Sequence, residues 1–371
     1  MMRQLGATIQ NHLLNISGKS ISKKVIVFES DDWGSVRIPS LSAYENLTKH
    51  GINLSKNPYN RFDSLETPDD LEAIFKVLLS YKDYKGNHPI ITTNFIMANP
   101  YFEKIQRNNY NEYFLETFVE TYKRNRHTYS SELLVRQGIA NRLIYPQFHG
   151  REHVNIPYWL KLLKQNNATL LKAFEQGIYS VDITSNINKR DNLLAALDFY
   201  SIEDKEFAEN HIVEGLDLFE KIFGYRSLSF IATCNVWNDH VEKVLSRSGV
   251  TTIQSLRGQK IPTSSGYLTK FLTTGQKSPS DQIYLVRNVY YEPSTNPSYD
   301  WIKNAILKIE AAFFWNKPAI ISSHRLNFIG SLSENNRRDN LKMLDALLNK
   351  ILKKWPDVEF MTTNQLAALY Q

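Results

Sequence analysis

The sequence contains one cysteine, Cys234, in 371 residues. A single cysteine excludes an intramolecular disulfide framework and any zinc or iron–sulfur site built from several cysteines. Glycine and proline are also scarce, with 15 and 13 residues, which excludes collagen-like and disordered low-complexity chains. Cys234 lies in an apolar, strand-like run, so we expect a buried and inert thiol.

Long apolar runs are absent as well. No stretch reaches the length of about 18 residues that a membrane-spanning helix needs. Residues 1–21 mix Arg3, Gln10 and His12 with apolar residues and contain no continuous apolar core of signal-peptide length. We therefore expect a cytoplasmic protein without a membrane span, in which residues 1–22 form an N-terminal extension.

The charge of the chain is only mildly biased. Lysine and arginine number 44 against 38 aspartate and glutamate residues, a formal net charge of +6. The excess is spread along the chain in short doublets such as Lys23-Lys24 and Arg337-Arg338, and this pattern predicts a solvated surface rather than a nucleic-acid partner. Apolar residues make up 42 % of the chain, enough for a full core. No feature of the sequence indicates the oligomeric state.

Short runs rich in β-branched residues alternate with longer helical patterns, which predicts a parallel sheet with crossover helices. Helical apolar stripes cover residues 68–82, 202–223 and 335–354. Thr67 is a plausible N-cap before Pro68. The predicted strands are residues 24–29, 90–98, 143–148, 178–184, 228–233, 251–255, 282–291, 319–322 and 358–361.

No internal repeat and no proline-rich or serine-rich linker divides the chain. The simplest architecture is a single barrel-like α/β domain over residues 1–371, with helical insertions at about residues 53–85 and 101–141. In such folds the loops that follow the carboxyl ends of the strands converge, so the chemistry is expected there.

Three predicted strand ends carry titratable residues that apolar packing would not select. The first strand leads into Asp31-Asp32-Trp33-Gly34. Two adjacent carboxylates repel each other and cost desolvation unless a cation compensates them, and a metal ion is one such cation. An acidic turn in which an aspartate caps a helix is the alternative.

The third strand leads into His149-Gly150-Arg151-Glu152-His153. If this segment turns helical, positions i and i+4 place both imidazoles on one face, which suits two ligands of one divalent ion. A late strand leads into His324-Arg325. Two histidines and one aspartate make a three-ligand site of the zinc type with room for water, and the remaining aspartate and histidine can share proton transfer around it.

The order and spacing of these motifs resemble the polysaccharide deacetylase family, the fourth carbohydrate esterase family. The resemblance implies that Asp31 is the general base and that His324 is the general acid. It also implies that Asp32, His149 and His153 hold a divalent metal ion, zinc or else cobalt or nickel. The implied fold is a distorted (β/α)7-type barrel, and the implied reaction is removal of an acetyl group from an N-acetylated saccharide, as a polymer or a nucleotide-linked or lipid-linked precursor.

Several positions depart from the family pattern. Trp33 separates the aspartates from Gly34, and the family's Arg-x-Pro motif is absent after residues 228–233, where the chain reads Cys234-Asn235-Val236-Trp237-Asn238. Asp300 is predicted to cap a helix over residues 301–314. The candidate substrate-binding residues are Trp33, Arg151, Trp237 and Arg325. Packing is the alternative for Trp33, and a surface position is the alternative for Arg151 and Arg325.

Three other functions remain open from the sequence. A metal-free relative on the same barrel would act on amide or ureide bonds, although it would not need the histidine pair. A glycoside hydrolase would use paired carboxylates such as Asp31 and Glu152. A catalytically silent glycan-binding protein would keep the barrel and bind sugars through its aromatic residues, 12 % of the chain.

Overall fold

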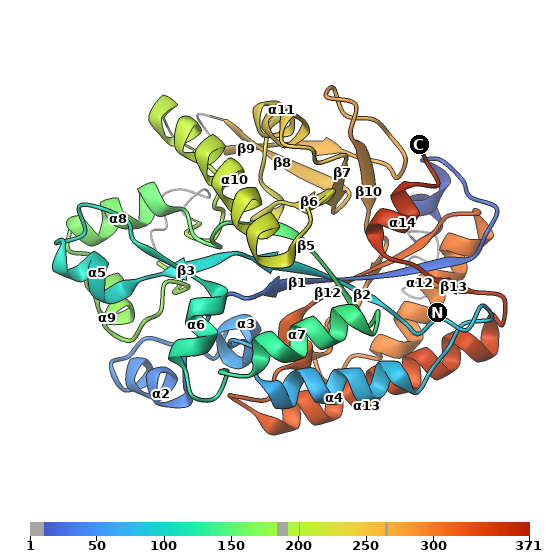
Figure 1. Cartoon of the computed structure of the whole chain (residues 1–371), viewed down its shortest axis with the longest axis horizontal. Coiled ribbons are helices and arrows are strands. Elements are labelled where there is room, and N and C mark those ends of the chain that lie inside the picture. The colour runs from blue at the N-terminus through green and yellow to red at the C-terminus, as the bar shows by residue number, and fades with distance from the viewer. Residues whose placement is uncertain (1–10, 184–191, 200, 264–265) are drawn as a thin grey trace.

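A computed structural model of the protein describes residues 11–183, 192–199, 201–263 and 266–371. Its centre is a parallel sheet in the order β10-β7-β6-β5-β2-β1-β12-β11 (Figure 1). The short strand β13 pairs with the start of β1. The strands of this sheet are β1 (Val25–Trp33), β2 (Ile91–Ile96), β5 (Ile144–Gly150), β6 (Ser229–Ile231), β7 (Thr252–Ser255), β10 (Ile283–Val286), β11 (Val289–Tyr290), β12 (Ala319–His324) and β13 (Glu359–Phe360).

The sheet closes on itself because β10 and β11 belong to one extended stretch of chain. Its first half pairs with β7 and its second half with β12. At the change of partner, the Arg287 amide donates to the Ser255 carbonyl at 2.9 Å and the Asn288 amide donates to the Ile320 carbonyl at 3.2 Å. With β10 and β11 counted as one strand, seven strands form the ring. The expected (β/α)7-type barrel is confirmed.

The helices lie around this ring. Figure 1 shows α4, α7 and α13 along one side of the sheet and α10 and α11 along the other. The helices are α2 (Leu41–Lys49), α3 (Pro58–Phe62), α4 (Pro68–Leu79), α5 (Phe102–Arg107), α6 (Phe118–Arg124), α7 (Ser131–Ala140), α8 (Ile156–Lys164), α9 (Ala168–Glu175), α10 (Ile202–Phe223), α11 (Asp239–Arg247), α12 (Trp301–Phe314), α13 (Glu334–Lys354) and α14 (Thr363–Ala367), with the 3-10 turns η1 (Thr233–Asn235), η2 (Pro293–Thr295) and η3 (Arg325–Phe328).

The helices predicted from apolar stripes are confirmed, and their caps explain where they begin. Thr67 and Asp70 form a capping box at the start of α4, and Asp300 accepts a hydrogen bond from the Lys303 amide at the start of α12. The α10 helix begins at the cap Ser201 and ends at Gly224, whose φ of 80° lies in the left-handed region. The predicted insertions contain α3 and α4 in the first and α5, α6 and α7 in the second.

Two predicted strands differ from the structure. The described part of residues 178–184, up to residue 183, contains no strand. Tyr179 and Val181 are apolar because they pack against Trp159 and Phe174 of α8 and α9, not because they belong to the sheet. Residues 90–98 break at Met97 into β2 and the short β3 (Ala98–Pro100), which pairs with β4 (Leu115–Thr117). The hairpin of β8 (Gly258–Thr263) and β9 (Gly266–Phe271) was not predicted.

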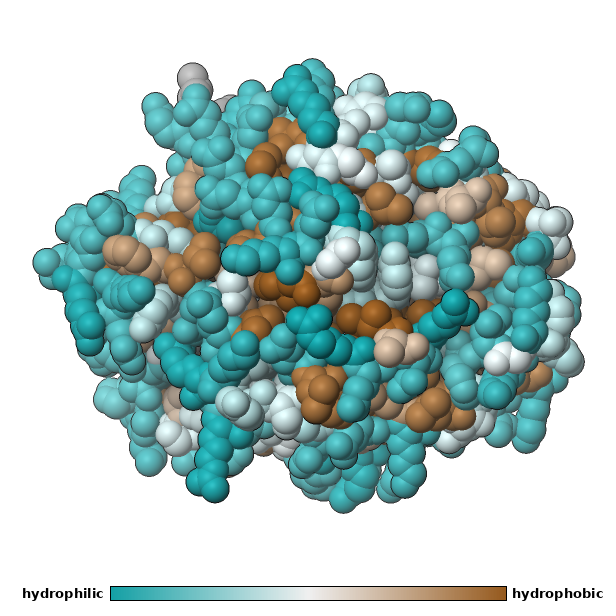
Figure 2. Space-filling view, in the orientation of Figure 1, coloured by the Kyte–Doolittle hydropathy of each residue, from teal (hydrophilic) through white to brown (hydrophobic). Residues whose placement is uncertain are grey.

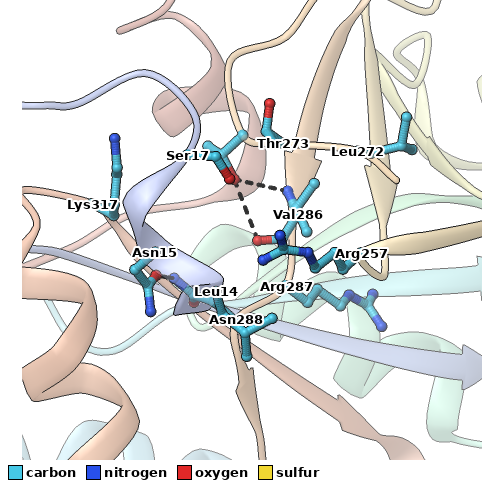
Figure 3. A pocket seen from close by; sticks show the side chains of 11 residues that line it. Leu14, Asn15, Ser17, Arg257, Leu272, Thr273, Val286, Arg287, Asn288 and Lys317 are labelled. Atoms are coloured by element: carbon cyan, nitrogen blue, oxygen red, sulfur yellow. Dashed lines mark hydrogen bonds between the residues drawn. The ribbon is translucent and has the colours of Figure 1, made fainter. Parts of the chain in front are cut away.

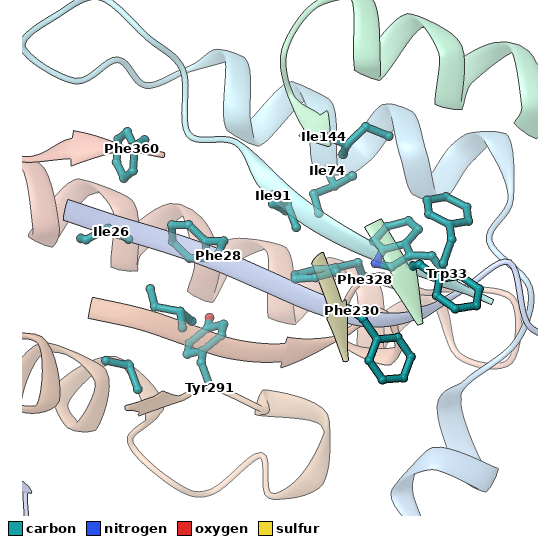
Figure 4. Packing of buried hydrophobic residues seen from close by; sticks show 14 of the residues in the cluster. Ile26, Phe28, Trp33, Ile74, Ile91, Ile144, Phe230, Tyr291, Phe328 and Phe360 are labelled. Atoms are coloured by element: carbon teal, nitrogen blue, oxygen red, sulfur yellow. The ribbon is translucent and has the colours of Figure 1, made fainter. Parts of the chain in front are cut away.

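The main core fills the ring and the space beneath the helices. Figure 4 shows Ile26 and Phe28 of β1 among side chains that include Ile91, Tyr291 and Phe360. Every residue of β1 is buried, as expected for a strand covered on both faces. Burial continues past Phe28 through Glu29, Asp31 and Asp32. The chemistry of this strand end is therefore largely withdrawn from water.

One face of the molecule is seen in Figure 2. The face in Figure 2 is hydrophilic over most of its area, with hydrophobic side chains visible in patches near its middle. None of the helices in the described residues combines the length and the apolar character that crossing a membrane requires.

Candidate active site

The carboxyl ends of β1, β5 and β12 bring the three titratable motifs to one edge of the barrel. β1 and β12 are aligned so that Asp31 and His324 are register partners. His149 is near the end of β5, which pairs with β2, the other neighbour of β1. Segments separated by more than 100 residues thus meet because parallel strands end at the same edge.

Asp32, His149 and His153 form a compact cluster of potential metal ligands. One ligand atom from each residue lies within 4.8 Å of the others, and all three residues are buried. Asp32 Oδ1 is 3.3 Å from His149 Nε2 and 3.2 Å from His153 Nε2. Asp32 adopts a φ of 73°, an unusual conformation for a residue other than glycine. This strained conformation occurs at the position where the carboxylate meets both imidazoles.

The helical turn expected for the two histidines is wrong. His149 belongs to β5, the chain turns through Gly150 with a φ of 131°, and His153 lies in the loop before α8. The loop is held to the neighbouring strand by two hydrogen bonds, from the Met97 amide to the Gly150 carbonyl and from the Ala98 amide to the Arg151 carbonyl. The two rings still meet, with centroids 5.4 Å apart, because the turn folds residue 153 back beside residue 149.

The orientation of these side chains fits a bound divalent cation. His149 Nδ1 is 2.9 Å from the Ile231 carbonyl oxygen. A carbonyl only accepts, so Nδ1 carries the proton and the lone pair of Nε2 faces Asp32. Asp32 Oδ1 is buried without a hydrogen-bond partner in the described structure. Burial lowers the pKa of His153 despite the opposing Asp32 carboxylate, which favours the neutral imidazole that metals bind.

Asp31 is held by a bidentate ion pair that the sequence did not reveal. Arg287 Nη1 donates to Asp31 Oδ2 at 2.6 Å and Arg287 Nη2 donates to Oδ1 at 2.7 Å. The Asn94 amide donates to Oδ1 at 2.8 Å. Burial by itself would raise the pKa of Asp31, but the Arg287 charge and its hydrogen bonds outweigh burial and lower that pKa. Asp31 is therefore ionised at neutral pH.

The same arginine also forms an ion pair with Glu29. Arg287 Nε donates to Glu29 Oε2 at 2.6 Å, and the Thr363 hydroxyl donates to Oε1 at 2.7 Å. Arg287 therefore binds two of the acidic side chains of β1. It comes from the point where β10 passes into β11.

A cavity of about 20 Å³, room for one water, is lined by residues that include Asn15, Arg287 and Lys317. The Arg287 side chain points away from this cavity (Figure 3).

His324 also has a carboxylate partner that the sequence did not reveal. Its Nδ1 is 2.5 Å from Glu292 Oε1, and its Nε2 is 3.7 Å from Asp31 Oδ2. Burial by itself would lower the pKa of His324, but the Glu292 charge and hydrogen bond raise that pKa to about 9. Asn327 donates to the other Glu292 oxygen at 2.6 Å. A protonated His324 thus faces Asp31 at neutral pH.

The two tryptophans considered for sugar stacking are core residues. Trp33 (Figure 4) is 1 % exposed and donates through Nε1 to the Ser30 hydroxyl at 3.0 Å. Its ring packs beside Phe95. Trp237 is fully buried and donates through Nε1 to Glu242 at 2.9 Å. Stacking on a sugar requires an open ring face, so the substrate-binding role considered for both tryptophans is wrong.

The two arginines considered for substrate binding are engaged in internal ion pairs. Arg325 is fully buried and contacts Asp63 at 3.0 Å and Glu66 at 2.5 Å. Arg151 donates to Glu152 at 2.8 Å and also to Glu214. Both guanidinium groups are committed to carboxylates of the protein, so the structure provides no substrate contact for either arginine.

Two other sequence features have structural explanations. Glu152 is fully buried against Arg151 and lies 3.1 Å from His211 Nδ1. It therefore offers no open carboxylate to pair with Asp31 in glycoside hydrolysis. Cys234 lies in η1 with a φ of 56° rather than in a strand, and it is partly buried. Burial raises the pKa of its thiol to about 11, so the thiol is protonated and unreactive at neutral pH.

Comparison with known proteins identifies similar folds but no close relative. No protein-family model matches the sequence, and no curated protein matches it significantly. A 4-α-glucanotransferase from Thermococcus litoralis is 10 % identical with a TM-score of 0.46, and the alignment covers 94 % of this chain but 40 % of that one. A structure described as a polysaccharide deacetylase from Mycobacterium smegmatis is 11 % identical with a TM-score of 0.43, covering 95 % and 93 % of the two chains.

The strongest structural similarity of the three is to a protein described as a glycoside hydrolase/deacetylase from Parabacteroides distasonis. The two chains are 8 % identical, the TM-score is 0.53, and the alignment covers 96 % of this chain and 72 % of the other. At this identity the similarity establishes the fold alone. The chain therefore shares the barrel fold of that glycoside hydrolase/deacetylase.

Proposed function

We propose that the protein is a metal-dependent hydrolase that removes the acetyl group from an N-acetylated sugar. The observation that carries this proposal is the placement of the Asp32, His149 and His153 cluster beside the Asp31 and His324 pair at one edge of the barrel. A three-ligand cluster next to an ionised carboxylate and a protonated imidazole provides the groups that amide hydrolysis requires.

Asp32 Oδ1, His149 Nε2 and His153 Nε2 are the atoms that would hold the divalent ion. When bound, such an ion polarises the acetamide carbonyl and lowers the pKa of a coordinated water, and zinc suits this donor set, with cobalt or nickel as alternatives. The Ile231 carbonyl keeps His149 in the tautomer that such binding needs.

The remaining groups divide the proton transfers. Asp31, kept ionised by Arg287, accepts a proton from the attacking water. His324, kept protonated by Glu292, donates a proton to the nitrogen of the leaving amine. Water adds to the acetyl carbon, the C–N bond breaks, and the products are acetate and the free amino sugar.

The test of the proposed function combines metal analysis with acetate detection. Purified protein is expected to contain about one divalent ion per chain, and the zinc-loaded protein is expected to release acetate from N-acetylated sugars. Chelation should abolish the release, and added zinc should restore it. Metal without acetate release would favour a silent glycan-binding relative, whereas acetate release that survives chelation would favour a metal-independent hydrolase.

The Glu292→Gln variant is expected to shift the alkaline limb of the rate profile. His324 donates a proton only in its charged form, so activity of the wild type should fall as pH rises through about 9. Without the Glu292 charge the pKa of His324 falls, and the midpoint of the alkaline limb of kcat should move to lower pH by about one to two units. The measurement is the pH dependence of kcat.

The matched control is Glu310→Gln, which removes an exposed carboxylate that pairs with Lys354 on the outer surface. Its profile should follow that of the wild type. An unchanged alkaline limb in Glu292→Gln would show that His324 does not supply the proton.

A further inference from the structure

Arg37 is a buried cation that the proposed reaction does not use. It lies in the loop after β1 and is 7 % exposed. Its Nε donates to Asn60 Oδ1 at 2.9 Å. Within the described part of the chain, Arg37 makes no ion pair, and its two terminal nitrogens have no hydrogen-bond acceptor. The Asp63 carboxylate is close enough to interact with the Arg37 charge, but its hydrogen bonds come from Arg325, so the terminal N–H groups of Arg37 remain available to a ligand.

Arg37 and His324, the candidate proton donor, both contact Tyr59. The Arg37 guanidinium lies 5.2 Å from the centre of the Tyr59 ring. The Tyr59 hydroxyl is 3.2 Å from His324 Nδ1, and the two rings meet edge to face with centroids 5.0 Å apart. One aromatic ring of α3 therefore contacts both the candidate acid and the unpaired cation.

The position of the guanidinium is fixed before any ligand arrives. Asn60 Oδ1, which accepts from Arg37, also accepts from the Ser180 hydroxyl at 3.3 Å, and the same hydroxyl lies 3.4 Å from the Arg37 carbonyl. Tyr59 stacking and the Asn60 hydrogen bond leave the terminal N–H groups as the available donors. A preorganised guanidinium of this kind matches the paired oxygens of a carboxylate or a phosphate.

We propose that Arg37 binds an anionic group, a carboxylate or a phosphate, that the N-acetylated sugar carries close to its acetamide. The substrate is then an acidic or phosphorylated amino sugar rather than a neutral one. This inference rests on the proposed function for the reaction, but the binding of the anion is measurable without turnover.

The experiment compares a neutral probe, N-acetylglucosamine, with N-acetylmuramic acid, N-acetylglucosamine 6-phosphate and N-acetylglucosamine 1-phosphate. At least one anionic probe is expected to exceed the neutral probe in kcat/KM by about 10- to 100-fold, the range of a charge-assisted pair. Arg37→Gln should remove this preference, chiefly through KM, and Arg37→Lys should keep part of it. Which probe is favoured distinguishes a carboxylate from a phosphate.

The matched control is Arg61→Gln, since Arg61 is an exposed cation one residue beyond Asn60 on the same helix. It should keep the preference for the anionic probe. An equal loss on neutral and anionic probes in Arg37→Gln would place the arginine on the reacting amide and overturn the proposal. A wild type without preference would also overturn it.

Calorimetric binding of the same probes separates this inference from the proposed function. If the wild type releases no acetate from any probe, the proposed function fails, while tighter binding of an anionic probe that is lost in Arg37→Gln still supports the anion site. Equal binding to the wild type and to the variant overturns it. Should Arg37→Gln fail to fold, Arg37→Lys decides the point, because a lysine keeps the charge but loses the paired donors and should bind the anion more weakly.

Discussion

Replacing Asp31 by asparagine is expected to lower kcat for acetate release by about 10²- to 10⁴-fold, the usual contribution of a general base. An asparagine amide keeps the size of the side chain but accepts no proton. Arg287 retains its ion pair with Glu29, so the barrel should stay folded. Asp32, His149 and His153 are unchanged, so the variant should still bind metal.

The measurement is acetate release under saturating substrate, with metal content determined on the same samples. Asp217→Asn serves as the matched control, because Asp217 lies on α10 and pairs with Arg226 on the outer surface. It should retain the wild-type rate. An Asp31→Asn protein with full turnover and bound metal would contradict the assignment of Asp31 as the base.

Replacing His153 by alanine is expected to weaken metal binding by more than about 100-fold, because one of three protein ligands is lost. The fold should persist, since His153 Nδ1 makes no hydrogen bond in the described structure and the side chain lies in a loop. Zinc should raise the melting temperature of the wild type, because it binds the folded state, and should leave that of the variant nearly unchanged.

Metal content after dialysis and thermal melting with and without zinc provide the readouts. The control is His240→Ala, which removes a partly buried histidine of α11 that pairs with Glu209 of α10. That variant should keep its metal and its zinc-dependent stabilisation. Full metal occupancy in His153→Ala would refute the cluster as the metal site.

The sequence predicted the fold and the central cluster because both follow from strand ends. Asp31, Asp32 and His324 follow predicted strands within three residues, and the parallel arrangement brings such ends together. The histidine pair was found by its spacing, although the helical turn assumed for it was wrong. A turn through Gly150 produces the same meeting of the rings.

The charged partners of the site were missed for a definable reason. Arg287 interrupts an apolar run of residues 282–291 that looked like one strand, and Glu292 follows that run directly. A charged residue inside a run that is otherwise apolar indicates a buried ion pair. The sequence around Arg287 shows this pattern and could have predicted its pairing. The change of pairing partner at Arg287 depends on the closed ring, which local patterns do not encode.

The aromatic residues show a different limit. Trp33 ends β1 and Trp237 lies beyond the end of β6, yet both are buried. Composition and spacing do not distinguish a tryptophan that faces a cleft from one that faces the core, because the difference lies in the local direction of the backbone. The same is true of residues 178–183, where an apolar run packs against helices instead of joining the sheet.

Arg287 lies where the barrel closes. Its ion pairs with Glu29 and Asp31 therefore form only when the strands on both sides of it are correctly aligned. Side chains alternate between the two faces of a strand, so a slip of one residue would turn Arg287 outward. Glu29 and Asp31 would then be buried without their cation, and removing one partner of a buried ion pair costs about 3–5 kcal/mol. Only the ring that closes in the native alignment avoids this penalty. The ion pair that prepares Asp31 for chemistry therefore also disfavours misaligned closed states of the barrel.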